Sequence, residues 1–421
     1  MKKGIISILI TCLLVSVIFT TGCVEDDGKE KNINPSQDVV FEGKNDYVNS
    51  SNEFTFDMYQ QLIDGDNNVF FSPYSIVTAL GMAYEGARGL TADEMEDVFD
   101  FIEDNETRWE MVRSVQSMLN ENNPSYELST ANAYWLREGE QLKDEYKKAI
   151  ESYYLAYGEE LDFRGDAEGS ADTINAWVEE KTNDKIKDLI APGVINFNTY
   201  LILTNAIYFK SDWKYQFDPD ATEDMSFFNS SGGEKLTPMM NIRDEEIDLD
   251  YSSNDDAQLL MLPYKDEELS MYILLPKRND IASLESKVDK AYMDNLKKDL
   301  SPEYVNLYLP KFKFELKYNL NEQLIAMGMP SAFDPLKSDF SGIKANSGEL
   351  WISKVIHQSF VEVNEEGTEA AAATAVVMED RAGGPTEPEP ILFMADHPFI
   401  FFIEHKETGQ ILFMGKVENP L

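Results

Sequence analysis

Cysteine and histidine are scarce in this sequence. Of its 421 residues only two are cysteines, Cys12 and Cys23, and both lie near the N-terminus. The rest of the chain therefore has no disulfide, no thiol nucleophile and no cysteine-based metal site. Only three histidines occur, His357, His397 and His405, all within the last 65 residues. Few residue types remain from which a catalytic or metal centre could be built.

Catalytic motifs are missing as well. The sequence has no Gly-x-Ser-x-Gly elbow, no His-Glu-x-x-His pair and no glycine-rich loop of the phosphate-binding kind. A Ser-His-Asp triad has no fixed sequence spacing, so an exported enzyme stays open as one hypothesis. It would need catalytic residues that no pattern in the sequence identifies.

Basic residues are few relative to acidic ones. Lysine and arginine number 36 against 77 aspartates and glutamates, for a formal net charge of -41. Such a chain repels phosphate backbones and anionic lipids, which excludes nucleic acid as a partner. The 43% of apolar residues, 12% of the chain being aromatic, suffices for one large packed domain or two ordinary ones.

The only long apolar run lies at the N-terminus, from Ile5 to Phe19 behind two lysines. It is too short to span a bilayer comfortably and typical of a signal peptide, so residues 1–22 are interpreted as an export signal. Cys23 follows Thr21 and Gly22, as in a lipoprotein signal, although Thr20 also leaves ordinary cleavage open. The polar, acidic residues 23–49 read as a tether. We therefore expect an exported protein, extracellular or held by a lipid on Cys23 at the outer face of the cell membrane.

The spacing of apolar residues changes along the remaining chain, from helical at first to strand-like later. Phe54, Met58 and Leu62 recur every four residues, as in an amphipathic helix. Further helices are expected from Pro73 to Tyr84 behind a Ser72 cap, through Phe99 behind a Thr91-Glu94 capping box, and from Asp172 to Lys185. Strands are expected at 201–209, 258–262, 269–275, 305–309, 360–363, 391–394, 399–403 and 411–414. Early helices followed by late strands predict an α+β fold.

Residues 364–384 form an alanine-rich run flanked by acid and closed by glycine and proline. Alanine favours helix, and an alanine-rich helix with a proline-rich linker is one interpretation. The other is a strand that can be inserted between strands, because every side chain from Ala370 to Ala375 is small. The connection between Val363 and Ile391 exceeds 25 residues, a length that is uncommon in a compact domain unless the loop is functional or disordered.

Several short motifs, taken in order, resemble those of one family, the serpins. The segments are FFSPYSI at 70–76, TNAIYFK at 204–210 with Trp213, DFSGI at 339–343, ISKVIHQ at 352–358, EEGTEAAAA at 365–373 and HPFIF at 397–401. Each is weak alone, but their order and spacing together are specific, and the resemblance covers residues 50–421.

The resemblance implies a serpin fold. It has three β-sheets, eight to nine helices and an exposed reactive-centre loop at about 365–390, above a main sheet that is one strand short. A protease attacks the loop and forms an acyl-enzyme, and the loop then inserts into the sheet and carries the protease about 50 Å. This is suicide inhibition rather than enzyme activity. No cofactor and no metal is implied, and the protein would be a monomer.

Carrying the family pattern over places the scissile bond at Arg381-Ala382, because Arg381 is the seventeenth residue counted from Glu365. Arginine is the side chain that a trypsin-like specificity pocket accepts. The acidic Glu379 and Asp380 beside the bond suggest a target with a basic subsite. The segment from Arg381 to Pro398 is longer than in typical relatives, which leaves cleavage after Met378 open.

The same resemblance assigns two further groups of residues. The hinge that inserts first comprises Glu365, Glu366, Gly367, Thr368, Glu369, Ala370, Ala371, Ala372 and Ala373, with Thr368, Ala370, Ala372 and Thr374 expected to face the core. The shutter, where the sheet strands part, comprises Ser72, Ser75, Asn205 and His357, and Trp213 marks the entry point of the loop. The small-residue hinge favours an inhibitor of trypsin-like serine proteases. An inhibitor of cysteine proteases and a non-inhibitory binding or chaperone-like relative are the alternatives.

Overall fold

A six-stranded main sheet organises the domain. The structure is a computed structural model and describes residues 44–119, 126–244, 247–344, 350–368 and 389–420. The strands of the main sheet lie in the order β11 (Phe312–Asn319), β12 (Ile356–Val363), β13 (Gly367–Thr368), β4 (Leu201–Asp212), β2 (Tyr126–Arg137) and β3 (Tyr157–Leu161). The two-residue β13 is much shorter than its neighbours, so among the described residues the middle of this sheet is paired only at one end.

Two further sheets share a strand. The second sheet has the order β1 (Val69–Phe71), β16 (Gln410–Val417), β15 (Phe399–His405), β9 (Leu269–Pro276), β8 (Ala257–Pro263) and β7 (Asp248–Ser253). The third contains β5 (Glu223–Phe228), β6 (Glu234–Ile242), β10 (Ser301–Pro310) and β14 (Ile391–Met394). β10 joins them, since its first half pairs with β7 and its second half with β6.

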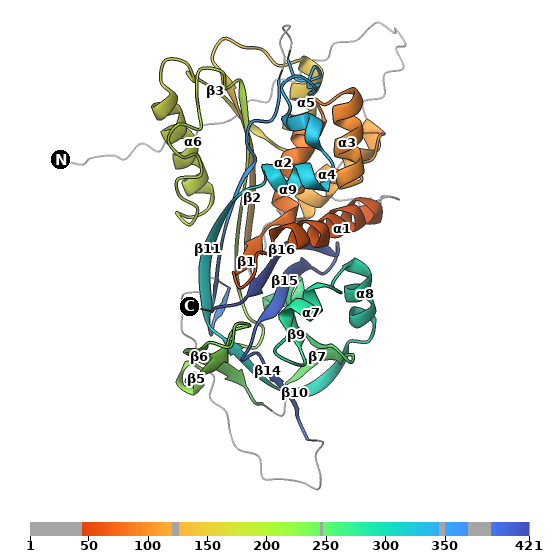
Figure 1. The fold of residues 1–421 in the computed structure, drawn as a ribbon, viewed down its shortest axis with the longest axis vertical. Coiled ribbons are helices and arrows are strands. Elements are labelled where there is room, and N and C mark those ends of the chain that lie inside the picture. Colours follow the sequence, from red (N-terminus) through yellow and green to blue (C-terminus); the bar gives the residue numbers. More distant parts are fainter. Residues whose placement is uncertain (1–43, 120–125, 245–246, 345–349, 369–388, 421) are drawn as a thin grey trace, which may run out of the picture. The chain divides into compact units, whose positions relative to one another are not determined.

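Nine α-helices surround these sheets in the described part of the chain. They are α1 (Lys44–Leu62), α2 (Pro73–Tyr84), α3 (Gly89–Phe99), α4 (Asn105–Leu119), α5 (Asp144–Ser152), α6 (Ala167–Lys181), α7 (Ile281–Glu285), α8 (Lys290–Lys298) and α9 (Asn321–Met327). Figure 1 shows α6 on one side of the main sheet and α1 to α5 with α9 on the other. The expected α+β fold with three sheets and eight to nine helices is confirmed.

Local sequence signals predicted some helix ends and missed others. Ser72 does cap α2, and Pro73 is its first residue. The expected capping box at Thr91 is wrong, because α3 already begins at Gly89 and has no side-chain cap. Thr91 is buried and instead accepts a hydrogen bond from the Asp339 backbone N–H at 2.9 Å. The Thr91 hydroxyl, which was expected to cap the helix, therefore takes part in a tertiary contact instead.

The helix expected from Asp172 to Lys185 is displaced along the chain. α6 begins at Ala167, behind an Asp166 cap, and ends at Lys181. The next residues cannot continue it, because Asn183 and Asp184 have φ values of 48° and 60°, in the left-handed region. The chain therefore leaves the helix about one turn early and runs across the main sheet.

Two hydrophobic clusters lie on opposite faces of the main sheet. The large one fills the space between this sheet, the second sheet and α1, α2 and α4. The small one lies beneath α6, where Trp135 of β2 packs with Ile174 and Val178 of α6. Both faces of the main sheet are thus covered, as a sheet of such apolar strands requires.

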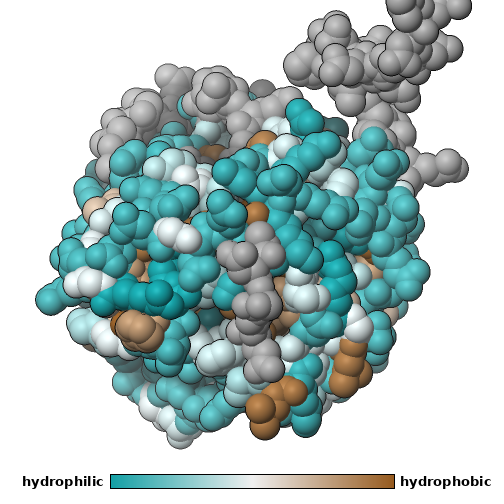
Figure 2. Space-filling view, turned by 90° about the horizontal axis from the view of Figure 1, so that it is seen from above, coloured by the Kyte–Doolittle hydropathy of each residue, from teal (hydrophilic) through white to brown (hydrophobic). Residues whose placement is uncertain are grey.

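The surface matches the acidic composition. The face seen in Figure 2 is mostly hydrophilic, and its apolar residues stand apart from one another. Within the residues that the structure describes, no helix has the length and apolar composition needed to cross a bilayer.

Gly86, just after α2, provides a test of packing. A Cβ atom at this position would lie 2.0 Å from the Ile343 Cγ1 atom. We expect Gly86→Ala to lower the free energy of unfolding by about 1–3 kcal/mol, measured by denaturant titration. The loss should shrink in an Ile343→Ala background, where the colliding atoms are gone. An equal loss in both backgrounds would contradict this explanation.

Candidate functional site

An open position separates β12 from β4. β12 pairs with β11 along its whole length, from Ile356 to Val363. On its other side the recorded pairing, within the described residues, is a single one, between Val363 and Thr368 of β13. β4 in turn meets β13 only at Ser211 and Asp212. Within the described residues, no ladder joins β12 directly to β4 below this point, and we call the position between the two strands the slot.

The first hinge residues already occupy the entrance of this slot. Gly367 and Thr368 form β13 and are bonded between β12 and β4. Only glycine fits at 367, because a Cβ atom there would lie 2.0 Å from the Ser211 carbonyl oxygen. The Asn364 side-chain oxygen accepts from the backbone N–H groups of Glu366 and Gly367, at 3.0 and 3.2 Å, and so shapes the turn into β13.

Thr368 is anchored on an aromatic pair. Its side chain is 4% exposed and faces the core, where its hydroxyl lies 2.7 Å from the hydroxyl of Tyr264. Tyr264 stacks on Trp213 with ring centroids 4.4 Å apart. Burial raises the pKa of Tyr264, so its hydroxyl stays protonated at physiological pH. The indole N–H of Trp213 donates to the Asn364 carbonyl oxygen at 3.0 Å.

Glu365 is held by a partly exposed ion pair and a hydrogen bond on the entry side. Lys311 Nζ lies 2.7 Å from one carboxylate oxygen of Glu365, and the Thr222 hydroxyl donates to the other at 2.9 Å. Burial works against the charged carboxylate, but the hydrogen bonds from Lys311 and Thr222 outweigh it and lower the pKa of Glu365. The backbone N–H of Phe217 also donates to the Glu365 carbonyl oxygen at 2.9 Å. The start of the hinge is therefore fixed.

The four predicted shutter residues form one connected polar group below the entrance. The Ser72 backbone N–H donates to His357 Nε2 at 3.0 Å, and the Ser75 N–H donates to the Ser72 hydroxyl at 3.2 Å. The Ser75 hydroxyl donates to the Asn205 side-chain oxygen. Burial lowers the pKa of His357 to about 4, so its ring is neutral and can accept this hydrogen bond. The group links β12, α2 and β4 across the slot.

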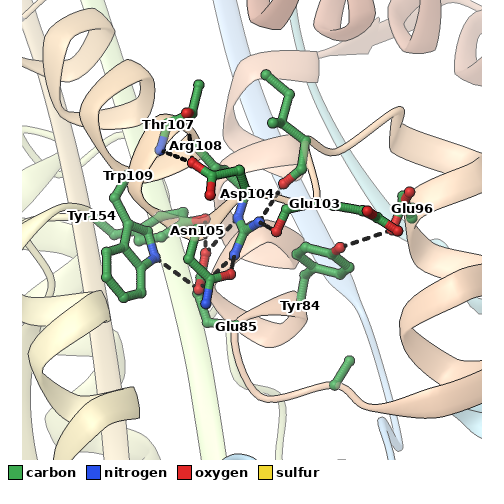
Figure 3. A network of polar contacts seen from close by, with 12 residues as sticks. Tyr84, Glu85, Glu96, Glu103, Asp104, Asn105, Thr107, Arg108, Trp109 and Tyr154 are labelled. Carbon is green, nitrogen blue, oxygen red and sulfur yellow. Dashed lines mark hydrogen bonds and ion pairs between the residues drawn. The ribbon is translucent and has the colours of Figure 1, made fainter.

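This polar group continues into residues that no sequence pattern indicated. Asn205 donates to the side-chain oxygen of Asn132 on β2, and Asn132 donates to the Tyr154 carbonyl oxygen at 2.6 Å. The Tyr154 hydroxyl donates to Glu85 at 2.9 Å. Glu85 also forms a bidentate ion pair with Arg108 of α4, at 2.8 and 2.9 Å (Figure 3). Both charges are buried, so α4 and the end of α2 are joined firmly.

A cavity of about 240 Å³ lies at the far end of the slot. Its walls come from both bordering strands and from α2, and include Leu201, Leu203 and Asn205 of β4, His357 of β12, Val355 just before β12, and Leu80 of α2. The walls are mainly apolar, with polar groups where the shutter residues reach it. An apolar space of this size between two strands can receive side chains of an added strand.

The remaining predicted site residues lie outside the described residues. They are Glu369, Ala370, Ala371, Ala372, Ala373, Arg381 and Ala382 of the loop, and Cys23 of the N-terminal segment. Sequence reasoning also missed Tyr264, Lys311 and Thr222. These lie 54 or more residues away in sequence from the hinge residues that they contact, and no local signal marks them.

Comparisons with known proteins agree with this architecture. The family model described as serpin (serine protease inhibitor) matches residues 49–420. An uncharacterized serpin-like protein of Methanosarcina acetivorans is 43% identical over 355 residues, 84% of this chain and 81% of that protein. Serpin B8 of Homo sapiens is 42% identical over 361 residues, 84% of this chain and 93% of that protein.

A solved structure supports the same conclusion. Serpin48 of the insect Tenebrio molitor superposes with a TM-score of 0.79 and 34% identity, over 90% of this chain and 99% of that chain. The fold and the half-filled slot define a protein of the serpin class. The chain belongs to the serpin family.

The buried His357 predicts a pH dependence of stability. In the unfolded chain its pKa returns to about 6.5, whereas in the native protein burial lowers it to about 4. Between these values the unfolded chain binds a proton that the native protein does not. We expect the free energy of unfolding to fall by up to about 1.4 kcal/mol per pH unit from pH 6.5 down to pH 4.

The measurement is denaturant unfolding of the wild type and of His357→Gln across that pH range. Subtracting the stability curve of His357→Gln from that of the wild type removes the contribution of the carboxylates, because both proteins contain the same ones. If both proteins lose stability equally between pH 6.5 and 4, His357 is not the group responsible.

The hydrogen bond between the Tyr264 and Thr368 hydroxyls should contribute to the local stability of β13. In Tyr264→Phe the buried Thr368 hydroxyl loses its partner, which should cost about 1 kcal/mol locally. We expect hydrogen exchange at the backbone amides of Gly367 and Thr368 to become about fivefold faster. Tyr272→Phe, a buried tyrosine of β9, is the control and should leave that exchange unchanged. Wild-type exchange rates in Tyr264→Phe would show that the hydroxyl pair does not hold the hinge.

Proposed function

We propose that this protein is a suicide inhibitor of trypsin-like serine proteases, which it traps as acyl-enzymes by inserting its cleaved loop into the main sheet. The observation that carries this proposal is the partly filled slot. Two residues of the predicted hinge are paired between β12 and β4, and no other described residue pairs in that position. Completing the sheet supplies backbone hydrogen bonds along a whole new strand, and this provides the driving force.

The register of these two residues supports a complete insertion. Continued in the same antiparallel register, Thr374 comes level with Asn205 and His357. Val376 then comes level with Leu203 and Val355, and Met378 with Leu201 and Ser353. Like Thr368, these residues have even numbers and would face the core. The threonine would meet the polar shutter, and the two larger apolar side chains would enter the cavity at the end of the slot.

The same register sets the distance over which a bound protease would be carried. Thr368 is already at the entrance, so the 13 residues from it to Arg381 would add about 43 Å of strand. β4 ends at Leu201, level with Met378, so Arg381 would emerge just beyond the far end of the sheet. A protease joined to Arg381 through an acyl bond would then lie at the opposite end of the domain. Such a pull supports distortion of its active site before deacylation.

The choice of protease rests on Arg381. A guanidinium group pairs with the buried carboxylate of a trypsin-like pocket, whereas the neighbouring Glu379 and Asp380 would suit a protease with a basic subsite. Cleavage after Met378 would indicate a different specificity, and trapping of a thiol enzyme would extend the function to cysteine proteases. A non-inhibitory relative would be cleaved without insertion.

The direct test is to mix the protein with trypsin and to run a denaturing gel. We expect a covalent band near the sum of the two masses, because the acyl-enzyme survives denaturation. Arg381→Ala should abolish this band, and Met378→Ala should leave it in place. Thr368→Arg should turn the inhibitor into a substrate, since it places a charge at a side chain that is only 4% exposed.

Two results would contradict the proposal. One is simple cleavage of the loop with no covalent band and no rise in thermal stability. The other is an unchanged trypsin complex in Arg381→Ala, which would retain inhibition but move the scissile bond.

A further inference from the structure

Two carboxylates meet one serine hydroxyl where the end of β16 contacts the turn between β5 and β6. We propose that Asp66, Ser230 and Glu418 form a binding site for a calcium ion. None of these residues belongs to the main sheet. The proposal is therefore independent of the proposed function, and the site would bind its ion whether or not the protein inhibits a protease.

The Ser230 hydroxyl lies between the two carboxylates. Its Oγ atom is 3.0 Å from Oδ1 of Asp66 and 2.5 Å from Oε1 of Glu418. A serine hydroxyl carries one proton, so it can donate to only one of these oxygens at a time. The other carboxylate oxygen then faces the lone pairs of the hydroxyl with no proton between them. A cation bound to all three oxygens removes this repulsion.

The burial of Glu418 is a second, independent observation. Glu418 is 0% exposed, and its Oε1 atom also accepts from the Ser230 backbone N–H at 2.7 Å. Its Oε2 atom is buried as well and has no hydrogen-bond partner in the part of the chain that the structure describes. Buried polar atoms nearly always have a partner, and a buried carboxylate requires a counter-charge or a metal ion. The unpartnered oxygen thus points to a ligand of positive charge.

The protein supplies no such charge within the site. The recorded side-chain contacts of Asp66 and Glu418, in the described residues, are with Ser230 and not with a lysine or arginine. Lys416 is buried two residues before Glu418, but its Nζ lies 3.2 Å from Glu285, and these two charges offset each other. The two negative charges of the site match a divalent cation.

The segments that carry the ligands are already held in place. The Asn68 side-chain oxygen accepts from the Glu418 backbone N–H at 2.7 Å and so fixes the end of the chain against the connection between α1 and β1. The Asn229 side-chain oxygen accepts from the Gly233 N–H at 2.6 Å and closes the turn that presents Ser230. Binding would need little rearrangement of the backbone, which favours affinity.

The types of ligand favour calcium over other ions. Asn419 can add an amide oxygen, since its own contacts are long, 3.5 Å to the Asp66 carbonyl oxygen and 3.4 Å to the Asn229 amide. Calcium accepts about six to eight oxygens in flexible geometry, whereas magnesium demands a near-ideal octahedron. No group of three or more histidine, cysteine, aspartate or glutamate side chains among the described residues could hold a metal. This site instead combines two carboxylates with neutral oxygens.

A bound ion would join parts of two sheets. β16 belongs to the second sheet, and the turn between β5 and β6 belongs to the third. Because few protein ligands are present, we expect a Kd of order 10⁻⁴–10⁻³ M, the range of extracellular calcium-binding modules. Such an affinity agrees with the export that the N-terminal sequence predicts.

The test is a calorimetric titration of the purified protein with calcium chloride. We expect one saturable site in the wild type. Asp66→Asn and Ser230→Ala, both at exposed positions, should each weaken calcium binding at least about tenfold, because each removes a ligand oxygen or its charge. Glu418→Gln should do the same, but this buried residue also contributes to folding, so the two exposed variants decide the result.

Thermal unfolding gives a second measurement. The unfolding temperature of the wild type should be higher in calcium chloride than in magnesium chloride at the same ionic strength. The magnesium series is needed because any cation screens the repulsion within a chain of net charge -41. In Asp66→Asn and Ser230→Ala the difference between the two salts should disappear.

Ser226→Ala is the matched control. Ser226 lies on the same hairpin, and its hydroxyl also donates to a carboxylate, that of Glu234, at 2.5 Å. In the described residues it has no recorded contact with a second carboxylate. Its removal should leave both calcium binding and the difference between the salts unchanged.

Three results would overturn the proposal. One is the lack of saturable binding to the wild type up to about 10 mM calcium chloride, well above the expected Kd. Another is wild-type affinity in both Asp66→Asn and Ser230→Ala, which would place the ion elsewhere. The third is equal stabilisation by magnesium and calcium in all the proteins, which is screening only. None of these results affects the trypsin complex, which depends on the loop and the slot.

Discussion

The structure depends most on one constraint: in the described residues β4 and β12 are not paired with each other, although they border the same position in the main sheet. Backbone N–H and C=O groups along buried strands need partners, and β13 supplies them only at the entrance, through Gly367 and Thr368. Both strands are otherwise well fixed, β12 by β11 and β4 by β2. In the described residues, the strand position between β12 and β4 is therefore filled only by Gly367 and Thr368. A strand delivered there gains hydrogen bonds on both of its edges.

Several weak contacts are distributed around this position. Lys311 and Thr222 hold Glu365, Tyr264 holds Thr368, and the shutter residues connect the two sides below. Each hydrogen bond contributes about 1 kcal/mol, whereas a completed strand would add many. Such contacts can retain the loop in an intact chain and still yield after cleavage, because cleavage frees the loop to move.

The buried ion pair of Glu85 and Arg108 stabilises the helix that positions part of the shutter. It lies at the end of α2, whose first turn carries Ser72 and Ser75. Through Tyr154 and Asn132 the same hydrogen-bonded series reaches Asn205 at the border of the slot. A displacement of α2 would therefore change the shutter, since both ends of the helix are tied to charged or polar partners. The slot depends on α2 as much as on its bordering strands.

The amino-acid sequence alone was enough to predict the fold class and the α2 cap at Ser72. These features depend on local periodicity, on capping chemistry and on motif order. It mispredicted the start of α3 and the limits of α6, where a contact with Asp339 and two left-handed residues override propensity. Nothing in the sequence indicated the roles of Tyr264, Lys311 and Asn132. Their roles come from contacts between residues far apart in the chain, and only the tertiary structure brings these together, because side-chain packing and hydrogen-bond geometry are properties of the folded molecule.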